Sequence, residues 1–375
     1  MTNTRRGMMG AAGASSDGIS GTLWTVGRGE DGSTGNEAVA STSSFAQIKT
    51  GISNWSGLCH GPPQRPWVGV TADGKRYAWG KGNPGSGGWG DVANRSSPVQ
   101  IGSLTNWGTV VGVSDYKVSQ HIKTDGTLWA SGQGSDGKTG LNNTTDYSSP
   151  VQVGSLTNWA HVSMGVSQAA AVKTDGTLWQ WGSGAGGATP FGHSDRRSSP
   201  TQVGSLTNWS KVYCGVGFNV AIKTDYTLWS WGVGANGVLG TGSKSNQSSP
   251  TQIGSLTNWK QASSGTIHSA AVKTDGTLWT FGGGGQGRLG NGNDTEEDSP
   301  VQVGSLTTWS QVACGANHTM AVKTDGTLWA FGSGGQGQLG QGNTTNYSSP
   351  VQVGSATDWL LIRSGEQTST AIRSA

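Results

Sequence analysis

The chain has 375 residues and an uneven composition, with 65 glycines, 18 tryptophans and 12% charged residues. Disordered chains are poor in aromatic residues and rich in net charge, so this composition excludes disorder as the main state. The net charge of +3 argues against nucleic-acid binding, which requires a clustered basic surface. The hydrophobic fraction of 32% is low for one large core and favours repeated units that bury their faces against one another.

Residues 1–19 are small and polar and precede the first repeated element. They contain no apolar run long enough for a secretory signal, and no part of the chain has the roughly 18 consecutive apolar residues of a membrane helix. We therefore expect neither classical secretion nor membrane insertion. The sequence predicts an N-terminal arm over 1–19, which could dock on a partner, and one repeat domain over 20–375.

Two aromatic positions repeat seven times along the rest of the chain. The first marker is an aromatic residue at Trp24, Tyr77, Trp129, Trp179, Trp229, Trp279 and Trp329. The second is a tryptophan at Trp55, Trp107, Trp159, Trp209, Trp259, Trp309 and Trp359. A Ser-Pro pair recurs in six units, and Phe45 stands at the seventh such place. The chain is therefore a duplicated unit of roughly 50 residues.

Each unit predicts four short strands, and the third complete unit shows them well. They are 159–165, 169–174, 177–182 and 200–204. Pro200 suits an edge strand because proline cannot donate to a central ladder. Seven units of four strands predict an all-β, seven-bladed β-propeller.

The hairpin between the second and third strands is marked by Asp175-Gly176. This pair predicts a two-residue turn with positive φ at both residues. Tyr226 stands at the glycine place in the next unit. Because bulky residues rarely adopt positive φ, we expect that turn to change type.

The two ends of the chain each supply part of one unit. The last unit stops at its second strand, near 370–373, and the missing third strand occurs at 21–27. We therefore expect the N- and C-terminal strands to share one blade and close the ring, which hides edges that would otherwise be exposed.

The repeated tryptophans are predicted to be structural before they are anything else. Burying one removes about 150–250 Å² from water, or roughly 4–6 kcal/mol at about 25 cal/mol per Å². A core or inter-blade role is therefore favoured over ligand binding.

The units resemble the regulator-of-chromosome-condensation repeat family over about 20–375. The best match carries Gly315-Ala316-Asn317-His318, the strands of 321–332 and Gly337-Gln338-Leu339-Gly340. The resemblance implies the propeller fold but not one function, because the family includes nucleotide-exchange factors, a plant ultraviolet receptor and a secreted inhibitor. The insertion that exchange factors use as a wedge and the Gly-Trp-Arg-His-Thr motif of the receptor have no counterpart here.

Strand order sorts the loops onto two faces. The turn after the first strand and the loop after the third strand form a variable face, whose sequence differs between units. The Asp-Gly turn and the Gly-Ser-Leu-Thr-Asn-Trp link form a uniform face. We expect the variable face to bind a protein partner, because interfaces favour Tyr, Trp, Phe and Arg and rigid scaffolds commonly carry function on loops. The candidate contact residues are Trp67, Trp89, Tyr116, Tyr147, Phe191, Arg196, Arg197, Phe218 and Tyr347.

Two alternatives to this interface stay open. The variable face could reflect relaxed drift on exposed loops. The uniform face could instead dock on a repeated or symmetric support.

The sequence predicts no catalytic residue, metal or cofactor. His268 and His318 share one repeat position, but zinc normally needs three or four ligands, so hydrogen bonding to a neighbouring turn is favoured. The oxygen-rich stretch 293–298 could hold Ca²⁺, although a solvated acidic loop is favoured because the Asp-x-Asp-x-Asp-Gly pattern is lacking. We expect Cys59, Cys214 and Cys314 to be buried free thiols.

Four functions compete. The first is a bacteriophage virion structural protein (a capsid decoration, fibre or tail-associated propeller) that contacts virion proteins or a host surface receptor. The second is a bacterial inhibitor or adhesin that uses the variable face, in the cytoplasm or after non-classical export. The third is an exchange factor, and the fourth is an enzyme such as a lyase or glycosidase. The sequence favours the virion protein, with no nucleic-acid partner.

Overall fold

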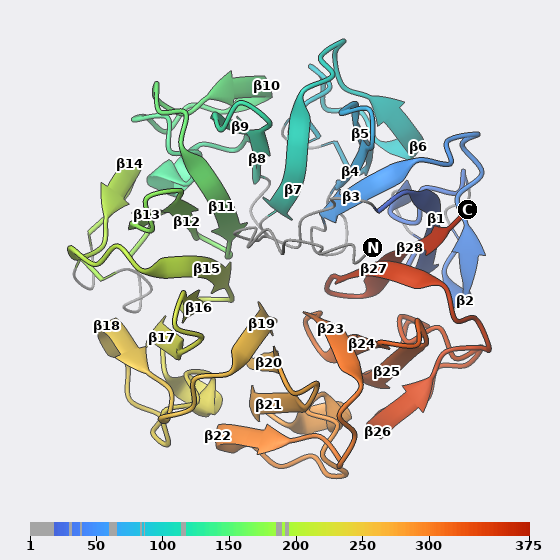
Figure 1. Cartoon of the computed structure of the whole chain (residues 1–375). Coiled ribbons are helices and arrows are strands. Elements are labelled where there is room, and N and C mark those ends of the chain that lie inside the picture. The colour runs from blue at the N-terminus through green and yellow to red at the C-terminus, as the bar shows by residue number, and fades with distance from the viewer. Residues whose placement is uncertain are drawn as a thin grey trace, which may run out of the picture.

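Strands arranged as blades around a central axis make up the computed structural model (Figure 1). It describes residues 19–29, 32–37, 40–59, 66–82, 85, 87–113, 118–184, 190–191 and 195–375. These residues form five four-stranded antiparallel sheets and one sheet of eight strands. The eight-stranded sheet is two blades joined by one residue pair, Gly21 with Trp55. The predicted seven-bladed, all-β propeller is confirmed.

Within blades 1 to 6, the strands follow one another in chain order from the channel outward. Blade 1 contains β3 (Trp55–Cys59), β4 (Trp67–Thr71), β5 (Arg76–Gly80) and β6 (Arg95–Gln100). Blade 2 contains β7 (Trp107–Val113), β8 (Val118–Lys123), β9 (Leu128–Gly132) and β10 (Tyr147–Gln152). Blade 3 contains β11 (Trp159–Met164), β12 (Gln168–Lys173), β13 (Leu178–Gly182) and β14 (Arg197–Gln202). Blade 4 contains β15 (Trp209–Cys214), β16 (Phe218–Lys223), β17 (Leu228–Gly232) and β18 (Gln247–Gln252).

The remaining blades repeat this order. Blade 5 contains β19 (Trp259–Ser264), β20 (His268–Lys273), β21 (Leu278–Gly282) and β22 (Glu297–Gln302). Blade 6 contains β23 (Trp309–Cys314), β24 (His318–Lys323), β25 (Leu328–Gly332) and β26 (Tyr347–Gln352). Blade 7 contains β27 (Trp359–Ser364), β28 (Thr368–Ser374), β1 (Gly21–Gly27) and β2 (Thr42–Gln47). Single 3-10 turns occur at η2 (Ser135–Gly137), η4 (Ala235–Gly237) and η5 (Gly285–Gly287).

Blade 7 closes the ring as predicted. β1 pairs with β28 without interruption from Gly21–Ser374 to Gly27–Thr368, and β2 completes the blade on the other side of β1. Figure 1 shows the blue β1 and red β28 side by side. The described part of the chain contains no helix of the length and apolar character that a membrane crossing requires. The boundary between an arm and the ring at 19/20 stays a prediction, because residues 1–18 lie outside the described residues.

The fourth strand starts earlier than the sequence indicates. In blade 3 it runs from Arg197 to Gln202 instead of 200–204, and Pro200 lies inside it. The register shifts between Gln180 and Gly182 of the neighbouring strand, opposite this proline. The missing N–H of Pro200 therefore falls at an irregularity of an outer strand, where no ladder bond is lost.

The Asp-Gly hairpins differ from the predicted two-residue turn. Lys173 N–H donates to Thr177 O at 3.0 Å, and Gly176 N–H donates to Lys173 O at 2.9 Å. Only Gly176 has positive φ, at 77°, so the loop has three residues and ends in a left-handed glycine bulge. The prediction was wrong because Asp175 acts through its side chain, which accepts bonds from the amide (3.0 Å) and hydroxyl (2.6 Å) of Thr177.

The expected change of turn type at Tyr226 was also wrong. Tyr226 keeps the turn of the other blades, with φ of 63° and its N–H donating to Lys223 O at 3.0 Å. A Cβ at the equivalent Gly176 would collide with the carbonyl oxygen of Thr207 in the adjoining link. At this hairpin, blade 4 therefore carries backbone strain that the glycine of the equivalent turns avoids.

Substitutions at Tyr226 and at Gly176 should change the free energy of unfolding in opposite directions. We expect Tyr226→Gly to raise the free energy of unfolding by about 1 kcal/mol, because glycine removes the left-handed penalty. Gly176→Ala should lower it by about 1–2 kcal/mol or more. Urea denaturation followed by tryptophan fluorescence measures both. Equal midpoints for wild type and Tyr226→Gly would show that the tyrosine is unstrained.

The repeated Lys-Thr-Asp-Gly-Thr-Leu-Trp segment forms the same network in each of the blades that carry it, blades 2 to 6. In blade 3, Trp179 Nε1 donates to Thr177 Oγ1 at 2.8 Å, and Thr177 in turn donates to Asp175. Trp179 meets Trp159 edge to face, with ring centroids 6.0 Å apart. The Lys173 ammonium lies 3.6 Å from the centroid of Trp179 and 5.0 Å from that of Trp159. The tryptophans are therefore structural, as predicted.

The same edge-to-face aromatic pair occurs in all seven blades, as two tryptophans in blades 2 to 7 and as Trp55 with Tyr77 in blade 1, with centroids 5.2 to 6.2 Å apart and planes 66° to 82° apart. Arg373 replaces the lysine in blade 7, and Thr71 takes its place in blade 1. The cation–π contact is thus a feature of blades 2 to 7.

The turn carboxylates should make the ring sensitive to acid. Bonds from the hydroxyl and amide of Thr177 hold the pKa of Asp175 below its usual range, and the same holds for Asp225 and Asp275. Groups whose folded pKa is lowered stabilise above the unfolded value of about 3.9 and lose that contribution as pH falls through the folded value. We expect the melting temperature to fall below about pH 4, and to fall less steeply when all three are changed to Asn. An equally steep fall in the triple Asn variant would contradict this origin of the acid sensitivity.

Candidate functional site

Hydrogen bonds confirm the assignment of loops to two faces. On the variable face, Ser183 N–H at the start of the loop after β13 donates to Ser167 O in the turn after β11 at 2.9 Å. On the uniform face, Trp159 N–H at the end of a link donates to Gly126 O in the preceding blade's turn at 3.1 Å.

The Gly-x-x-His element of blades 5 and 6 fastens each of these two blades to the next one on the variable face. A Cβ at Gly315 would collide with the Gly365 carbonyl oxygen and the His318 ring, so only glycine fits. His318 Nε2 bonds Ser369 Oγ at 2.8 Å, and His268 Nε2 bonds Thr319 Oγ1 at 2.9 Å, each in the next blade. Burial lowers the pKa of both histidines to about 3, so they are neutral.

The structural role predicted for the two histidines is confirmed, but each bonds a hydroxyl on the second strand of the next blade and not a neighbouring turn. Among the described residues, no three His, Cys, Asp or Glu side chains gather as metal ligands. A hydrogen bond within the acidic stretch 293–298 stabilises its conformation: Thr295 N–H donates to Asn293 Oδ1 at 2.8 Å. Glu296 pairs with Lys244 of the preceding blade at 2.6 Å.

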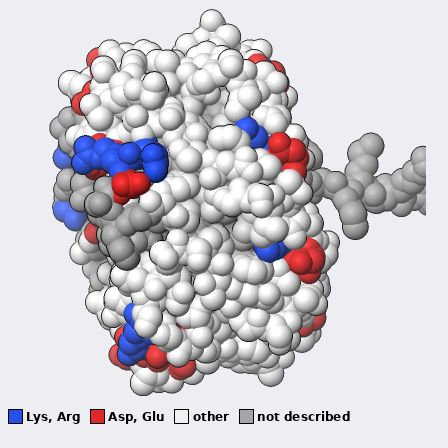
Figure 2. All heavy atoms as spheres, turned by 90° about the vertical axis from the view of Figure 1, so that its left-hand side faces the viewer, with Lys and Arg blue, Asp and Glu red and all other residues white. Residues whose placement is uncertain are grey.

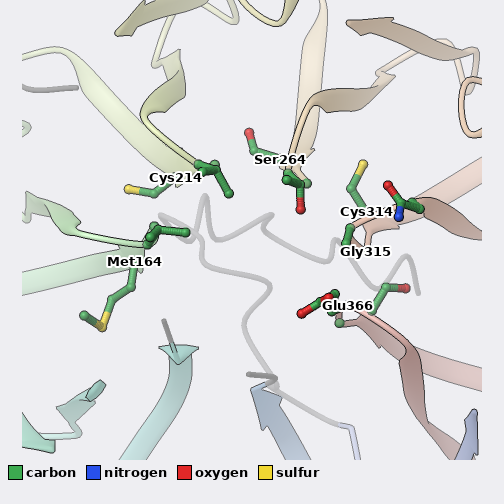
Figure 3. Close-up of a pocket in the computed structure, with 16 residues that line it drawn as sticks. Met164, Cys214, Ser264, Cys314, Gly315 and Glu366 are labelled. Atoms are coloured by element: carbon green, nitrogen blue, oxygen red, sulfur yellow. The ribbon is translucent and has the colours of Figure 1, made fainter. Parts of the chain in front are cut away.

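A cavity of about 380 Å³ opens where the turns after the first strands meet. Figure 3 shows Met164, Cys214, Ser264, Cys314 and Glu366 around it, contributed by five successive blades. Five glycines at one repeat position supply backbone to its wall, so the lining is polar and side-chain poor. They are Gly165, Gly215, Gly265, Gly315 and Gly365.

The thiols beside the cavity are not nucleophiles. Cys214 Sγ donates to Ser163 O at 3.4 Å, and Cys314 Sγ donates to Ser263 O at 3.3 Å. Burial raises the pKa of both thiols to about 12. Cys59 is also buried and forms no disulfide, so the prediction of buried thiols is confirmed for all three cysteines.

The outer rim of the variable face carries two matching groups, two blades apart. On blade 3, the Arg197 guanidinium lies 5.5 Å from the Phe191 ring centroid and 3.0 Å from Asp195 Oδ2. On blade 1, the Arg95 guanidinium lies 5.4 Å from the Trp89 ring centroid and 2.8 Å from Asp91 Oδ2.

The rim between these groups is also built from predicted contact residues. Arg196 of the same loop as Phe191 pairs with Asp136 of blade 2 at 2.8 Å. Tyr147, at the start of β10, occupies on blade 2 the register place of Arg197, opposite the last glycine of the third strand. Its hydroxyl accepts from Asn143 Nδ2 at 2.9 Å. Tyr347 has the same place on blade 6 and accepts from Asn343 at 3.0 Å, distant from the blade 1–3 rim.

Two predicted contact residues are corrected. Trp67 is 1% exposed and stacks on Trp79 inside blade 1, at 6.2 Å and an interplanar angle of 6°. Phe218 is fully buried and lies over Gly215 at the histidine place of the Gly-x-x-His element. Both belong to second strands and pack in the core, so neither side chain is available to a partner. Tyr116 lies outside the described residues.

Sequence reasoning missed two surface features. Arg95 was overlooked, although alignment of the units places it at the position of Arg197. The uniform face carries one leucine per link in five successive links, each 43% to 49% exposed. These are Leu104, Leu156, Leu206, Leu256 and Leu306. Each is flanked by exposed Ser and Thr, so they are single apolar residues rather than one patch.

The fold and rim define a propeller of the binding class, with a rigid ring and differentiated loops on one face. A family model described as the RCC1-like domain matches residues 68–371. The chain therefore belongs to the RCC1-like domain family, as the repeat predicted.

Solved structures with the same fold include human WBSCR16 and yeast Prp20. Human WBSCR16 has a TM-score of 0.81 at 18% identity, covering 95% of this chain and 99% of that chain. Prp20p from Saccharomyces cerevisiae, studied for its binding to Gsp1p and histones, has a TM-score of 0.81 at 16% identity, covering 94% and 91%. Yeast RCC1 (Prp20) bound to Kap60 has a TM-score of 0.82 at 16% identity, covering 100% and 96%. At these identities the likeness establishes the fold.

Substitutions at Trp67 and Trp89 of blade 1 should distinguish a core position from a rim position by their effects on stability. We expect Trp67→Ala to lower the free energy of unfolding by about 3–5 kcal/mol, since it empties a buried site. Trp89→Ala should lower it by about 1 kcal/mol or less, because Trp89 is partly exposed. Thermal and urea denaturation measure both, and similar losses for the two variants would place Trp89 in the core.

Proposed function

We propose that this chain is a non-enzymatic binding propeller whose protein partner docks on the variable-face rim of blades 1 to 3. The observation that carries this proposal is the pair of aromatic–arginine–aspartate groups at Trp89 and Phe191. In each group the arginine is held over a ring and against a carboxylate. Its conformational entropy is therefore largely lost before binding, which favours affinity.

The chemistry of this rim is that of interface hot spots. Arginine and large aromatic residues dominate measured binding energies when they are pre-organised and surrounded by polar groups. The equivalent places on blades 4 and 5 hold Gln247 and Glu297, so the rim is differentiated around the ring. Figure 2 shows the charged side chains as small mixed-sign groups on a mostly uncharged surface. Such small mixed-sign groups fix the orientation of a docked partner more than they attract it from a distance.

The relatives support a protein partner. Prp20p was studied with Gsp1p and histones, and yeast RCC1 (Prp20) was solved with Kap60, all of which are proteins. An exchange-factor role is disfavoured, because the loop before Ser-Pro keeps one length in every unit and no wedge is inserted. An enzyme is disfavoured because the described thiols and the repeat-position histidines are buried and hydrogen-bonded into the ring.

We further propose that the partner belongs to a bacteriophage particle or to the host surface that the particle recognises, which locates the chain on the virion. The support comes from the sequence: recently duplicated units, a Ser-, Thr-, Asn- and Gly-rich surface and a small-residue arm. The human and yeast relatives do not bear on this location. A bacterial inhibitor or adhesin that uses the same rim is the second candidate.

A photo-cross-linking residue introduced at Arg196 tests both parts of the proposal. We expect it to capture one protein in the source cells, at a yield that falls about tenfold when Phe191 and Arg197 are changed to Ala. The same cross-linker at Leu206, on the uniform face, is the matched control and should capture little. Sedimentation of the cell extract before mass spectrometry then shows whether the cross-linked product is in a particle or in the soluble fraction.

The outcomes separate the two parts. Capture from Leu206 but not from Arg196 would move the interface to the uniform face. Capture from Arg196 at fixed stoichiometry in a sedimenting particle supports the virion proposal, and capture only in the soluble fraction contradicts it.

A further inference from the structure

The outermost strand of each blade pairs on one side only among the described strands. In six blades a proline lies inside this strand. These prolines are Pro98, Pro150, Pro200, Pro250, Pro300 and Pro350. In β2 of blade 7, Phe45 holds the same register place. Exposed strand edges are templates for pairing with another chain, and proline is one of the residues that block them. Blade 7 therefore lacks a protection that the other six blades have.

The register shows which backbone groups of β2 face outward. Ile48 N–H donates to Leu23 O of β1 at 2.8 Å. Because successive residues of an antiparallel strand alternate in the direction of their backbone groups, Ala46 also faces β1, whereas Phe45 and Gln47 direct their N–H and C=O groups away from it. Figure 1 shows β2 at the outer rim of the ring, so these groups face away from the molecule. Proline removes the first of these two N–H donors in the other blades.

The Phe45 ring fills a place that an aromatic residue of the third strand fills in other blades. Val26 of blade 7 holds the register place of Phe331 in blade 6. The Phe45 ring lies against Gly340 of blade 6, and its centroid is 4.9 Å from that of Trp359. A phenylalanine at position 26 with a proline at position 45 would give blade 7 the same two residues as blade 6. The ring and the outward N–H of Phe45 can therefore be separated by substitution.

The chemistry of β2 suits a second copy of the same strand. Its sequence, TSSFAQ, carries no charge, whereas β6, β14 and β22 each contain an arginine or acidic residues. Like charges directly opposite each other destabilise a strand pair, so an uncharged strand is compatible with pairing to itself. A two-fold axis can place Ala46 opposite Ala46 of the second copy. In that register, Phe45 of each chain exchanges N–H···O=C bonds with Gln47 of the other.

We propose that two copies of this chain associate through β2, as an antiparallel pair about a two-fold axis, so that the two copies of blade 7 form one continuous sheet. A single strand pair buries little area, so the dimer is weak, with a dissociation constant in the micromolar range. The interface consists of backbone groups on the outer circumference of blade 7. It uses none of the residues of the rim on blades 1 to 3, so it does not rest on the proposed function.

Sedimentation velocity of the full chain, from about 1 to about 300 µM, tests this pairing. We expect a reversible, concentration-dependent shift from monomer to dimer. Val26→Phe combined with Phe45→Pro gives blade 7 the residues that blade 6 has at these two places. This double variant should weaken dimerisation about tenfold or more, because proline removes an N–H donor from each chain and its ring crowds the second strand.

A second variant keeps the test independent of repacking around Phe45. Ala46→Lys places two ammonium groups opposite each other across the two-fold axis, and should weaken dimerisation about fivefold or more. Thr251→Lys, at the same register place of the uncharged strand β18, is the matched control and should change the dissociation constant by less than about twofold. A cooperative urea transition verifies an intact ring in each variant.

Three outcomes would overturn the proposal. Wild-type chain that stays monomeric up to about 300 µM would exclude the second copy and leave this edge to a strand of a different protein. An unchanged dissociation constant in Ala46→Lys would place the dimer interface elsewhere. An equal loss in Thr251→Lys would reduce the effect to general charge repulsion between the chains.

Discussion

The edge-to-face contact between the two repeated aromatic residues, which are both tryptophans in blades 2 to 7 and Trp55 with Tyr77 in blade 1, is the constraint on which every blade depends. It joins the first strand to the third across the blade, and in blades 2 to 7 a lysine or arginine packs on the pair. The same tryptophan is tied through Thr177 and Asp175, in blade 3, to the hairpin that precedes it. All of these groups lie at the uniform-face end of the strands. That face is uniform because its residues are committed to holding the blade, which leaves variation to the opposite loops.

The sequence was sufficient for the fold because its signals are periodic and mutually consistent. The repeated aromatic residues predicted seven units, and the proline agreed in six of them. The missing third strand predicted a shared closing blade, as observed. The turn geometry was predicted less well. An Asp-Gly pair is compatible with several hairpin turn types. Which type forms depends on whether the turn is set by the backbone of Asp175 or by hydrogen bonds to its side chain.

The candidate site was only partly predictable, because a position in a repeat does not reveal where a side chain points. Trp67 follows a stretch without repeat markers, and only the strand register shows that it corresponds to the buried Ala169. Its ring has room because Gly69, two residues on, allows Trp55 to approach closely. Phe218 was assigned to a loop although it begins β16. The aromatic–arginine groups became recognisable only when two distant loops were compared at the same register.

The interface between blades 1 and 2 contains residues that the other blade interfaces lack. This interface is therefore chemically distinct from the others. Arg76 stands where the other third strands have leucine, and Ser131 replaces a buried aromatic residue. The Arg76 guanidinium is fully buried, donates to Ser119 Oγ at 3.3 Å and lies 5.5 Å from the Trp107 centroid. Among blades that otherwise pack almost interchangeably, a buried polar contact of this kind penalises incorrect pairing.

Closure through β1 and β28 also fixes the order in which the molecule can be completed during its synthesis. The residues of β1 are made before blades 1 to 6, yet their main partner strand is made after them. Blades 1 to 6 are contiguous in sequence and can form one after another, whereas blade 7 must wait until β28 has been synthesised. Until then, β1 and the face of blade 6 that packs on blade 7 expose strand edges and apolar surface. The nascent chain therefore passes through an open arc whose most vulnerable strand is the one made earliest in the ring.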